Sequence, residues 1–142
     1  MFNNIFLQRI IAHEGSIPYA YQDSLGYWTI GIGRLIDKRK GGHLSQDEIT
    51  YLLNNDLSNV SKELSVYSWF QGLDSVRKEV LIELCFNIGL PNLLCFKNMI
   101  DALFHHDYQR ASKELLLSNW AKEVGNERVS DLHQRILTGS YE

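Results

Sequence analysis

A capped apolar stripe in the middle of the chain limits the possible folds more than any other feature. Ser45-Gln46-Asp47-Glu48 has the form of a capping box, in which the serine caps a helix and the glutamate reaches back to the serine backbone. Apolar residues then recur every three or four positions on one face: Ile49, Leu52, Leu53, Leu57, Val60 and Leu64. The pattern predicts a helix of about 20 residues, about 30 Å long, which is long enough to connect two lobes.

The residues before this helix change from a helical to a strand-like pattern. Four apolar residues at helical spacing predict a short amphipathic helix that stops near Gly15: Ile5, Phe6, Ile10 and Ile11. Residues 16–36 instead hold aromatic and β-branched residues, interrupted by Pro18 and several glycines, with a turn at 23–26. We therefore expect a small antiparallel sheet over 16–36.

The remainder of the chain is helical in pattern. Apolar periodicity predicts helices over 76–88, 93–104, 108–119 and 127–137, with Gly89 and Gly139 as stop signals. The expected fold class is α+β. It has a small antiparallel β-sheet lobe, about 14–60, joined by the long helix to a larger helical lobe, about 1–13 plus 61–142. Together they form one domain, 1–142.

The charge balance and the apolar pattern exclude several classes of protein. Fourteen Lys and Arg against 17 Asp and Glu give a net charge of −3, which argues against a nucleic-acid partner. The densest basic run, Lys38-Arg39-Lys40, is expected to be a solvated loop or a contact for anionic polymers. No apolar stretch approaches the length of about 20 residues that spans a bilayer, and no signal peptide is recognisable, so we expect no membrane insertion.

Cys85 and Cys95 lie in apolar runs, and we expect two buried free thiols.

The histidines do not indicate a metal site. His13-Glu14 begins like the HExxH zinc motif, but Ile17 occupies the position of the second histidine. His105 and His106 are adjacent, so on a helix they point in different directions. We therefore expect the protein to bind no metal ion and to need no cofactor.

Glu14, Asp23 and Thr29 are the most informative polar residues, in the pattern E-x8-D-x5-T. Glu14 ends a predicted helix and the other two flank a turn, so all three side chains can converge where the helix meets the sheet. Acid-catalysed glycoside cleavage needs such a set: one carboxyl group protonates the leaving oxygen, while a second, ionised carboxylate acts on water or stabilises the sugar cation. Without further context, a capping glutamate, a turn aspartate and a strand threonine explain the same residues.

The wider sequence resembles the phage T4-type lysozymes, the endolysin family of glycoside hydrolases. Besides the E-x8-D-x5-T pattern, several segments fall in family-like order: Thr29-Ile30-Gly31-Ile32-Gly33, Leu73-Asp74-Ser75-Val76-Arg77, Phe86-Asn87-Ile88-Gly89, Trp120 and Thr138-Gly139-Ser140-Tyr141. The resemblance covers essentially the whole chain. It implies the two-lobed fold and a peptidoglycan-cleaving activity.

The resemblance also implies roles for individual residues. Glu14 resembles the general acid that protonates the glycosidic oxygen, and Asp23 resembles the carboxylate that positions the attacking water or stabilises positive charge, with Thr29 sharing that water. The chemistry requires Glu14 to hold a proton near neutral pH while Asp23 is ionised. Leu35 and Phe86 match positions that contact sugar rings on opposite walls of the family's cleft.

Further correspondences include departures from the family. Asn87 replaces a glutamine but keeps an amide, and Arg128 matches an arginine that closes the cleft and pairs with the catalytic acid, with a solvated helix arginine as the alternative. Arg34 stands where the family commonly has histidine. We expect Arg34 to pair with a nearby carboxylate and to alter the pH profile. Met99 and Glu114 stand where relatives place polar groups that touch substrate.

The function implied is a muramidase that cleaves the β-1,4 bond between N-acetylmuramic acid and N-acetylglucosamine, with inversion. The expected partner is bacterial peptidoglycan, and the expected state is a monomer. The enzyme would be made in the host cytoplasm of a phage and would reach periplasmic peptidoglycan through a separate membrane-permeabilising protein. The alternatives are a lytic transglycosylase and a noncatalytic peptidoglycan-binding descendant of the fold.

Overall fold

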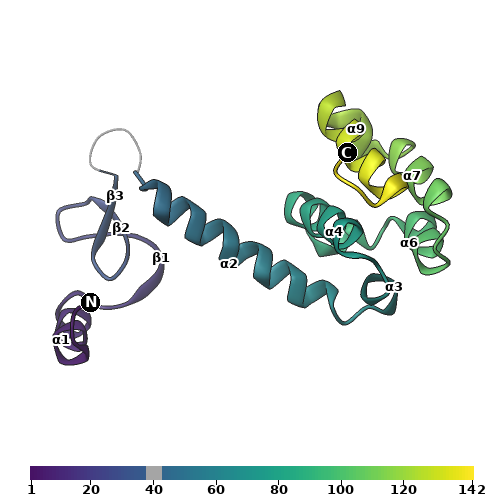
Figure 1. The fold of residues 1–142 in the computed structure, drawn as a ribbon. Helices are drawn as coiled ribbons and strands as arrows, with labels where there is room; N and C mark the ends of the chain where they lie inside the picture. The colour runs from purple at the N-terminus through teal and green to yellow at the C-terminus, as the bar shows by residue number, and fades with distance from the viewer. Residues whose placement is uncertain (38–42) are drawn as a thin grey trace. The chain divides into compact units, whose positions relative to one another are not determined.

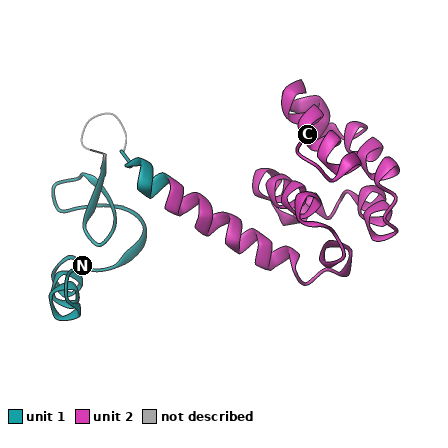
Figure 2. Cartoon of the chain, viewed as in Figure 1, with its two compact units in different colours: residues 1–49 teal, residues 50–142 magenta. Residues whose placement is uncertain are grey.

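The computed structural model describes residues 1–37 and 43–142, which belong to two compact units (Figure 2). Unit 1 is Met1–Ile49 and unit 2 is Thr50–Glu142. The Lys38-Arg39-Lys40 loop lies outside the described residues. The lobe limits expected from the sequence stay a prediction, as does the single catalytic domain.

The two units differ in secondary structure (Figure 1). Unit 1 contains a helix, a sheet and the start of a long helix: α1 (Asn4–Glu14), β1 (Ile17–Gln22), β2 (Trp28–Gly31), β3 (Arg34–Asp37) and α2 (Gln46–Leu64). Unit 2 holds the rest of α2 and further helices: α3 (Ser68–Gln71), α4 (Ser75–Ile88), α5 (Leu90–Leu93), α6 (Lys97–Phe104), α7 (Tyr108–Leu116), α8 (Asn119–Glu123) and α9 (Asn126–Thr138). The expected α+β class is confirmed. Among the described residues, no helix combines the length and apolarity needed to cross a membrane.

The sheet is antiparallel, with strand order β1-β2-β3. Tyr21 of β1 lies opposite Thr29 of β2, and Thr29 lies opposite Leu35 of β3. Directly opposed residues on neighbouring strands project from the same face. The register therefore puts Tyr21, Thr29 and Leu35 in one row across the sheet.

The start of α2 follows the capping-box prediction. Ser45 Oγ accepts a hydrogen bond from the Glu48 backbone N–H at 3.3 Å, and the Glu48 carboxylate accepts from the Ser45 N–H at 2.9 Å. The reciprocal bonds satisfy backbone donors that the first turn of a helix leaves without partners. This local chemistry fixes where α2 begins.

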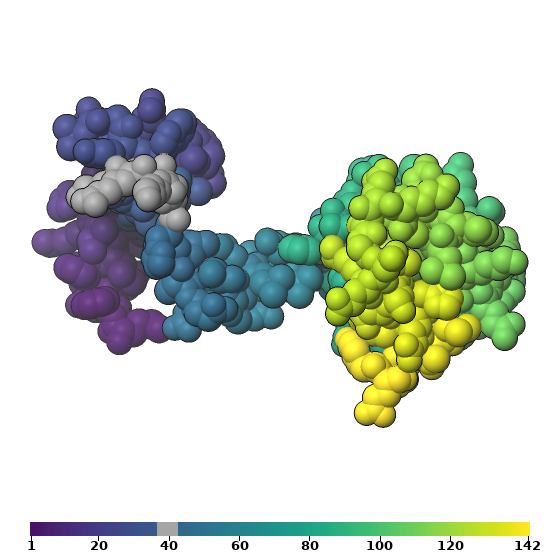
Figure 3. Space-filling model, turned by 90° about the horizontal axis from the view of Figure 1, so that it is seen from above, coloured from purple at the N-terminus to yellow at the C-terminus, as the bar shows by residue number. Residues whose placement is uncertain are grey.

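The apolar core lies in unit 2. Helices α4, α6, α7 and α9 each contribute buried side chains to it. Figure 3 shows the outer surface of the residues around this core, coloured from green to yellow. The buried apolar residues are Leu64, Phe70, Leu73, Val80, Leu81, Leu84, Cys85, Leu93, Met99, Ala102, Leu103, Ala111, Leu115, Trp120, Val129, Leu132 and Ile136.

Both cysteines are free, as expected, but only Cys85 is buried. Burial raises the pKa of its thiol, as does the nearby charge of Glu63. The expectation that Cys95 is buried is wrong. Cys95 lies in the turn after α5, where its Sγ is 3.4 Å from the Pro91 carbonyl oxygen.

Two predicted helices have different limits in the structure. The helix expected over 93–104 begins only at Lys97, because Phe96 leaves helical geometry with ψ of 59°. The helix expected over 108–119 ends at Leu116, and Ser118 then caps α8 by accepting from the Ala121 N–H at 3.2 Å. Helix periodicity continues through such short breaks, so periodicity alone does not detect them.

Candidate active site

Glu14 is the last residue of α1, and its side chain lies against the turn between β2 and β3. The helix ends because Gly15 adopts φ of +81° while its N–H still bonds to the Ile11 carbonyl at 2.8 Å. A Cβ atom at Gly33 would lie only 2.9 Å from Glu14 Cδ, closer than such atoms approach one another. Gly33 also has φ of +66°, a conformation that favours glycine. The absence of a side chain at Gly33 thus makes room for the Glu14 carboxyl group.

Asp23 lies in the turn between β1 and β2. Its Oδ1 atom accepts hydrogen bonds from the backbone N–H groups of Leu25 and Tyr27, each at 2.9 Å. The Gly26 N–H closes the turn on the Asp23 carbonyl at 3.0 Å. Both side-chain bonds use the same oxygen, and within the described part of the chain no group donates to Oδ2. The turn therefore orients the carboxylate and leaves one oxygen available.

Thr29 is 4% exposed and is tied to the same turn. Its Oγ1 donates to the Tyr27 carbonyl at 3.1 Å, and that carbonyl also accepts from the Asp23 N–H at 2.9 Å. Since the Tyr27 N–H binds the Asp23 carboxylate, the Tyr27 peptide groups connect both candidate residues. Because the Thr29 hydroxyl uses its only proton in this bond, the lone pairs of Oγ1 remain able to accept a hydrogen bond from a water or a substrate.

The three catalytic candidates therefore belong to one unit and lie on or beside one sheet. Ile17, at the start of β1, lies opposite Gly31, so the segment after Glu14 joins the sheet at the β2–β3 turn. Asp23 lies at the opposite end of β2, and Thr29 lies between. Along a strand each residue advances about 3.4 Å, so Thr29 is about 7 Å along the backbone from Gly31. The sequence predicted a turn at 23–26, but it did not predict that the Tyr27 backbone would link Asp23 and Thr29.

Leu35, a candidate for contact with sugar rings, lies beside Thr29. It is directly opposite Thr29 in the register and is 42% exposed. Tyr21 flanks Thr29 on the other side and was not among the sequence candidates. Tyr21 is found only from the strand register, which the sequence does not specify.

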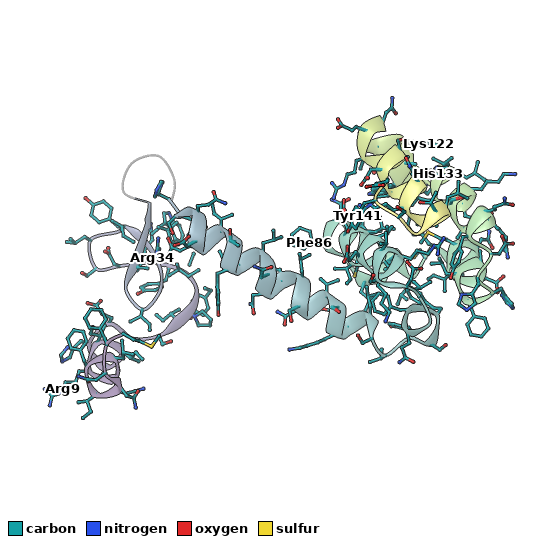
Figure 4. All side chains as sticks on the ribbon, viewed as in Figure 1. Arg9, Arg34, Phe86, Lys122, His133 and Tyr141 are labelled. Carbon is teal, nitrogen blue, oxygen red and sulfur yellow. The ribbon has the colours of Figure 1, made fainter. Side chains whose placement is uncertain are left out.

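Arg34, labelled in Figure 4, lies at the start of β3. Among the described residues its ion pair is with Glu48 and not with Glu14. Its guanidinium donates to Glu48 Oε1 at 2.9 Å and to the His43 carbonyl at 3.2 Å. Glu48 is the capping-box residue, so Arg34 connects β3 with the start of α2. Hydrogen bonds from the Ser45 backbone and side chain, with a further contribution from Arg34, lower the pKa of Glu48. The expected pairing of Arg34 with a nearby carboxylate is thus found. Its partner, Glu48, caps α2 and is not one of the catalytic candidates.

The remaining sequence candidates lie in unit 2. Phe86, labelled in Figure 4, lies on α4. It is 46% exposed. Asn87 is also exposed, and its Oδ1 accepts from Trp120 Nε1 at 2.8 Å, which orients its amide. Arg128 of α9 is half-buried, with its Nε 3.4 Å from Glu83 Oε2. Both interpretations of Arg128, the arginine that closes the cleft and the solvated helix arginine, therefore stay predictions.

A cavity of about 510 Å³ also lies in unit 2. Its walls include Trp120, together with Met99 and Glu114, the two residues that the resemblance placed at positions of substrate contact. In the part of the chain that the structure describes, no group of three His, Cys, Asp or Glu residues is arranged to hold a metal ion.

Comparison with known proteins matches residues 11–136 to the phage lysozyme family model. "Probable T4-type lysozyme 1" of Dictyostelium discoideum is 28% identical over 140 residues, covering 80% of this chain and 82% of that protein. "Endolysin" of Acyrthosiphon pisum secondary endosymbiont phage 1 is 27% identical, covering 84% of this chain and 80% of that protein. "Pre-baseplate central spike protein Gp5" of Enterobacteria phage T4 is 27% identical over 91% of this chain but only 27% of its own length.

Proposed function

The chain belongs to the phage lysozyme family, and from that premise we propose that it cleaves the β-1,4 bond between N-acetylmuramic acid and N-acetylglucosamine with inversion. As a member of the family it is a glycoside hydrolase acting on peptidoglycan. The observation that carries the finer proposal is the Tyr27 peptide link, which holds Asp23 and Thr29 together on the sheet that also receives Glu14.

In the proposed reaction, Glu14 gives its proton to the glycosidic oxygen as the bond between that oxygen and the anomeric carbon breaks. A water attacks the anomeric carbon from the opposite side and passes a proton to Asp23. The free Oδ2 of Asp23 and the lone pairs of Thr29 Oγ1 are suited to hold that water. An inverting reaction needs carboxyl groups about 6.5–9.5 Å apart, so that the water fits between sugar and base.

The proposed substrate-binding residues are Leu35, Phe86, Asn87 and Arg128. Leu35, beside Thr29, and Phe86 each present an exposed apolar surface that suits the face of a sugar ring. The oriented amide of Asn87 supplies hydrogen-bond donors, and Arg128 is the candidate for the arginine that closes the cleft in the family. No cofactor or metal takes part in the proposed mechanism.

The proposed biological role is lysis of a bacterial host at the end of a phage cycle. The monomeric enzyme is made in the host cytoplasm and reaches periplasmic peptidoglycan through a separate membrane-permeabilising protein. The endolysin relative supports this role by its name. Expression in bacteria with and without such a permeabilising protein tests the role, because lysis should require both.

The catalytic assignment is tested by Glu14→Gln, which keeps the shape of the side chain but cannot donate the proton. We expect a loss of about 10²–10⁴-fold in the rate at which purified peptidoglycan is solubilised. Asp47→Asn, a matched charge loss in the first turn of α2, is the control and should retain activity. Equal activity of Glu14→Gln and the unaltered protein would overturn the assignment.

Mass spectrometry of the products separates this proposal from its alternatives. Hydrolysis yields reducing muramic acid ends, whereas a lytic transglycosylase yields 1,6-anhydro ends. A noncatalytic descendant would release neither product while still binding peptidoglycan. Only reducing ends agree with the proposal.

A further inference from the structure

Tyr21 of β1 adjoins both groups that are proposed to hold the attacking water. It lies directly opposite Thr29 in the strand register, and directly opposed residues place their Cβ atoms about 4.5–5.5 Å apart on one face of a sheet. The strand pairing continues to Asp23, whose N–H bonds to the Tyr27 carbonyl at 2.9 Å. Since side chains alternate along a strand, Asp23 is the next position on the Tyr21 face, about 7 Å along the backbone. Tyr21 is therefore a neighbour of Asp23 and of Thr29 at once.

The row across the sheet leaves little open space beside Thr29. Thr29 is 4% exposed, whereas Leu35, its neighbour on the other side, is 42% exposed. Tyr21 is half-buried and has the largest side chain in the row. Because Thr29 Oγ1 can still accept a hydrogen bond, a molecule that reaches it must be small.

The hydroxyl group of Tyr21 has no role in holding the described fold. Within the residues that the structure describes, this hydroxyl makes no hydrogen bond, in contrast to the hydroxyl of Tyr141, which donates to Glu79. Buried tyrosine hydroxyls usually have such a partner. The ring, and not the hydroxyl, is therefore the part of Tyr21 that matters beside Thr29.

We propose that Tyr21 is a specificity-determining residue that closes one side of the nucleophile site, so that water and not a larger hydroxyl compound attacks the anomeric carbon. The inference rests on the proposed function, in which Asp23 and Thr29 hold that water. A peptidoglycan hydrolase works among many sugar hydroxyl groups, and attack by one of them would join glycan strands instead of cutting them. The Tyr21 ring prevents such attack by excluding nucleophiles whose oxygen carries a carbon.

Methanol is the smallest alcohol that can probe the size of this site. In its reaction, the methanol oxygen bonds to the anomeric carbon as the glycosidic bond breaks. The methanol proton passes to Asp23, and the leaving oxygen takes the proton of Glu14. The product is a methyl glycoside instead of a reducing end, so the ratio of the two products reports which nucleophile attacks. This ratio does not depend on how much folded enzyme is present.

The experiment measures the product ratio by mass spectrometry after soluble peptidoglycan chains are cleaved in mixtures of water and methanol. Tyr21→Ala removes the ring, and we expect the share of methyl glycoside to rise about tenfold, since one extra carbon group costs about that factor in a closed pocket. Tyr21→Phe keeps the ring and should leave the ratio unchanged. Tyr21→Leu keeps an apolar side chain but shortens it, so a smaller rise is expected there even if Tyr21→Ala folds poorly.

Tyr19→Ala is the matched control, because Tyr19 lies on the same strand but is 65% exposed. Its product ratio should equal that of the unaltered protein. An unchanged ratio in both Tyr21→Ala and Tyr21→Leu, or an equal rise in Tyr19→Ala or Tyr21→Phe, would overturn the inference. The proposed function would survive each of these results, provided that Glu14→Gln is inactive and the unaltered protein releases only reducing ends in water.

Discussion

The two units of the molecule are stabilised in different ways. In unit 2, apolar side chains from α4, α6, α7 and α9 form a continuous core. In unit 1, Thr29 is the single buried residue among residues 1–36 and 43–49, and it is polar. Side-chain to backbone hydrogen bonds stabilise the described helix starts and turn of unit 1. They are made by Asn3 at α1, by Asp23 in the β1–β2 turn, and by Glu48 to Ser45 at α2.

This difference between the units suggests that the apolar core of unit 2 provides most of the stability, whereas unit 1 provides the candidate catalytic groups. A segment of about 50 residues buries too little surface for a large core of its own. Its turns instead place polar side chains with defined hydrogen bonds, which is what acid–base chemistry requires. Core substitutions in unit 2 should therefore change stability, and substitutions at the turns of unit 1 should change activity.

The largest effect is expected in the core. Leu84→Ala removes a side chain of α4 that is 0% exposed and should lower the free energy of unfolding by about 2–5 kcal/mol. Leu25→Ala, in the exposed turn of unit 1, is the control and should change it by less than about 0.5 kcal/mol. Urea denaturation followed by circular dichroism measures both. Similar losses in the two variants would contradict the contrast between the units.

A pair of glycine variants tests the link between turn geometry and activity in unit 1. Gly31 and Gly33 both have φ of +66°, but only at Gly33 would a Cβ collide with Glu14. Gly33→Ala and Gly31→Ala should therefore share a strain cost of about 1–2 kcal/mol. Gly33→Ala should lose a further factor of about ten in kcat, because it displaces the general acid. Equal kcat values in the two variants would show that contact with Gly33 does not position Glu14.

The smallest effect concerns pH and the start of α2. The folded-state pKa of Glu48 lies below its usual value of 4.5, because Ser45 and Arg34 stabilise the ionised form. The contribution of Glu48 to stability is therefore fully present above about pH 4.5 and is lost as the pH falls through the lower folded-state value. Glu48→Gln should flatten the acid side of the thermal-stability curve measured from pH 3 to 7. An unchanged acid slope would argue against this coupling.

The sequence predicted the elements whose signals are local. The capping box located the start of α2, and the glycines at 15, 89 and 139 located the ends of α1, α4 and α9. The break before α6 and the separate helix α8 were missed, because apolar spacing continues across them. The exposure of Cys95 was also missed, since apolar neighbours in sequence do not ensure burial.

For the candidate site, the sequence identified residue types but not how they are held. The E-x8-D-x5-T pattern pointed to Glu14, Asp23 and Thr29, whose roles stay predictions. The Tyr27 peptide link and the position of Tyr21 depend on strand register, which two irregularities in the sheet alter. The partners of Arg34 and Arg128 depend on tertiary contacts, so neither Glu48 nor Glu83 was predicted from sequence to be a partner of these arginines.

The central claim is that Glu14 and Asp23 act as acid and base on opposite sides of the anomeric carbon. Proton nuclear magnetic resonance of the first products released from peptidoglycan tests it most directly, because the anomeric configuration is recorded before mutarotation. The account predicts that the β-linked substrate yields the α-anomer, and that Glu14→Gln yields no product signal on the same timescale. A first product in the β-configuration, or a 1,6-anhydro product, would contradict the account.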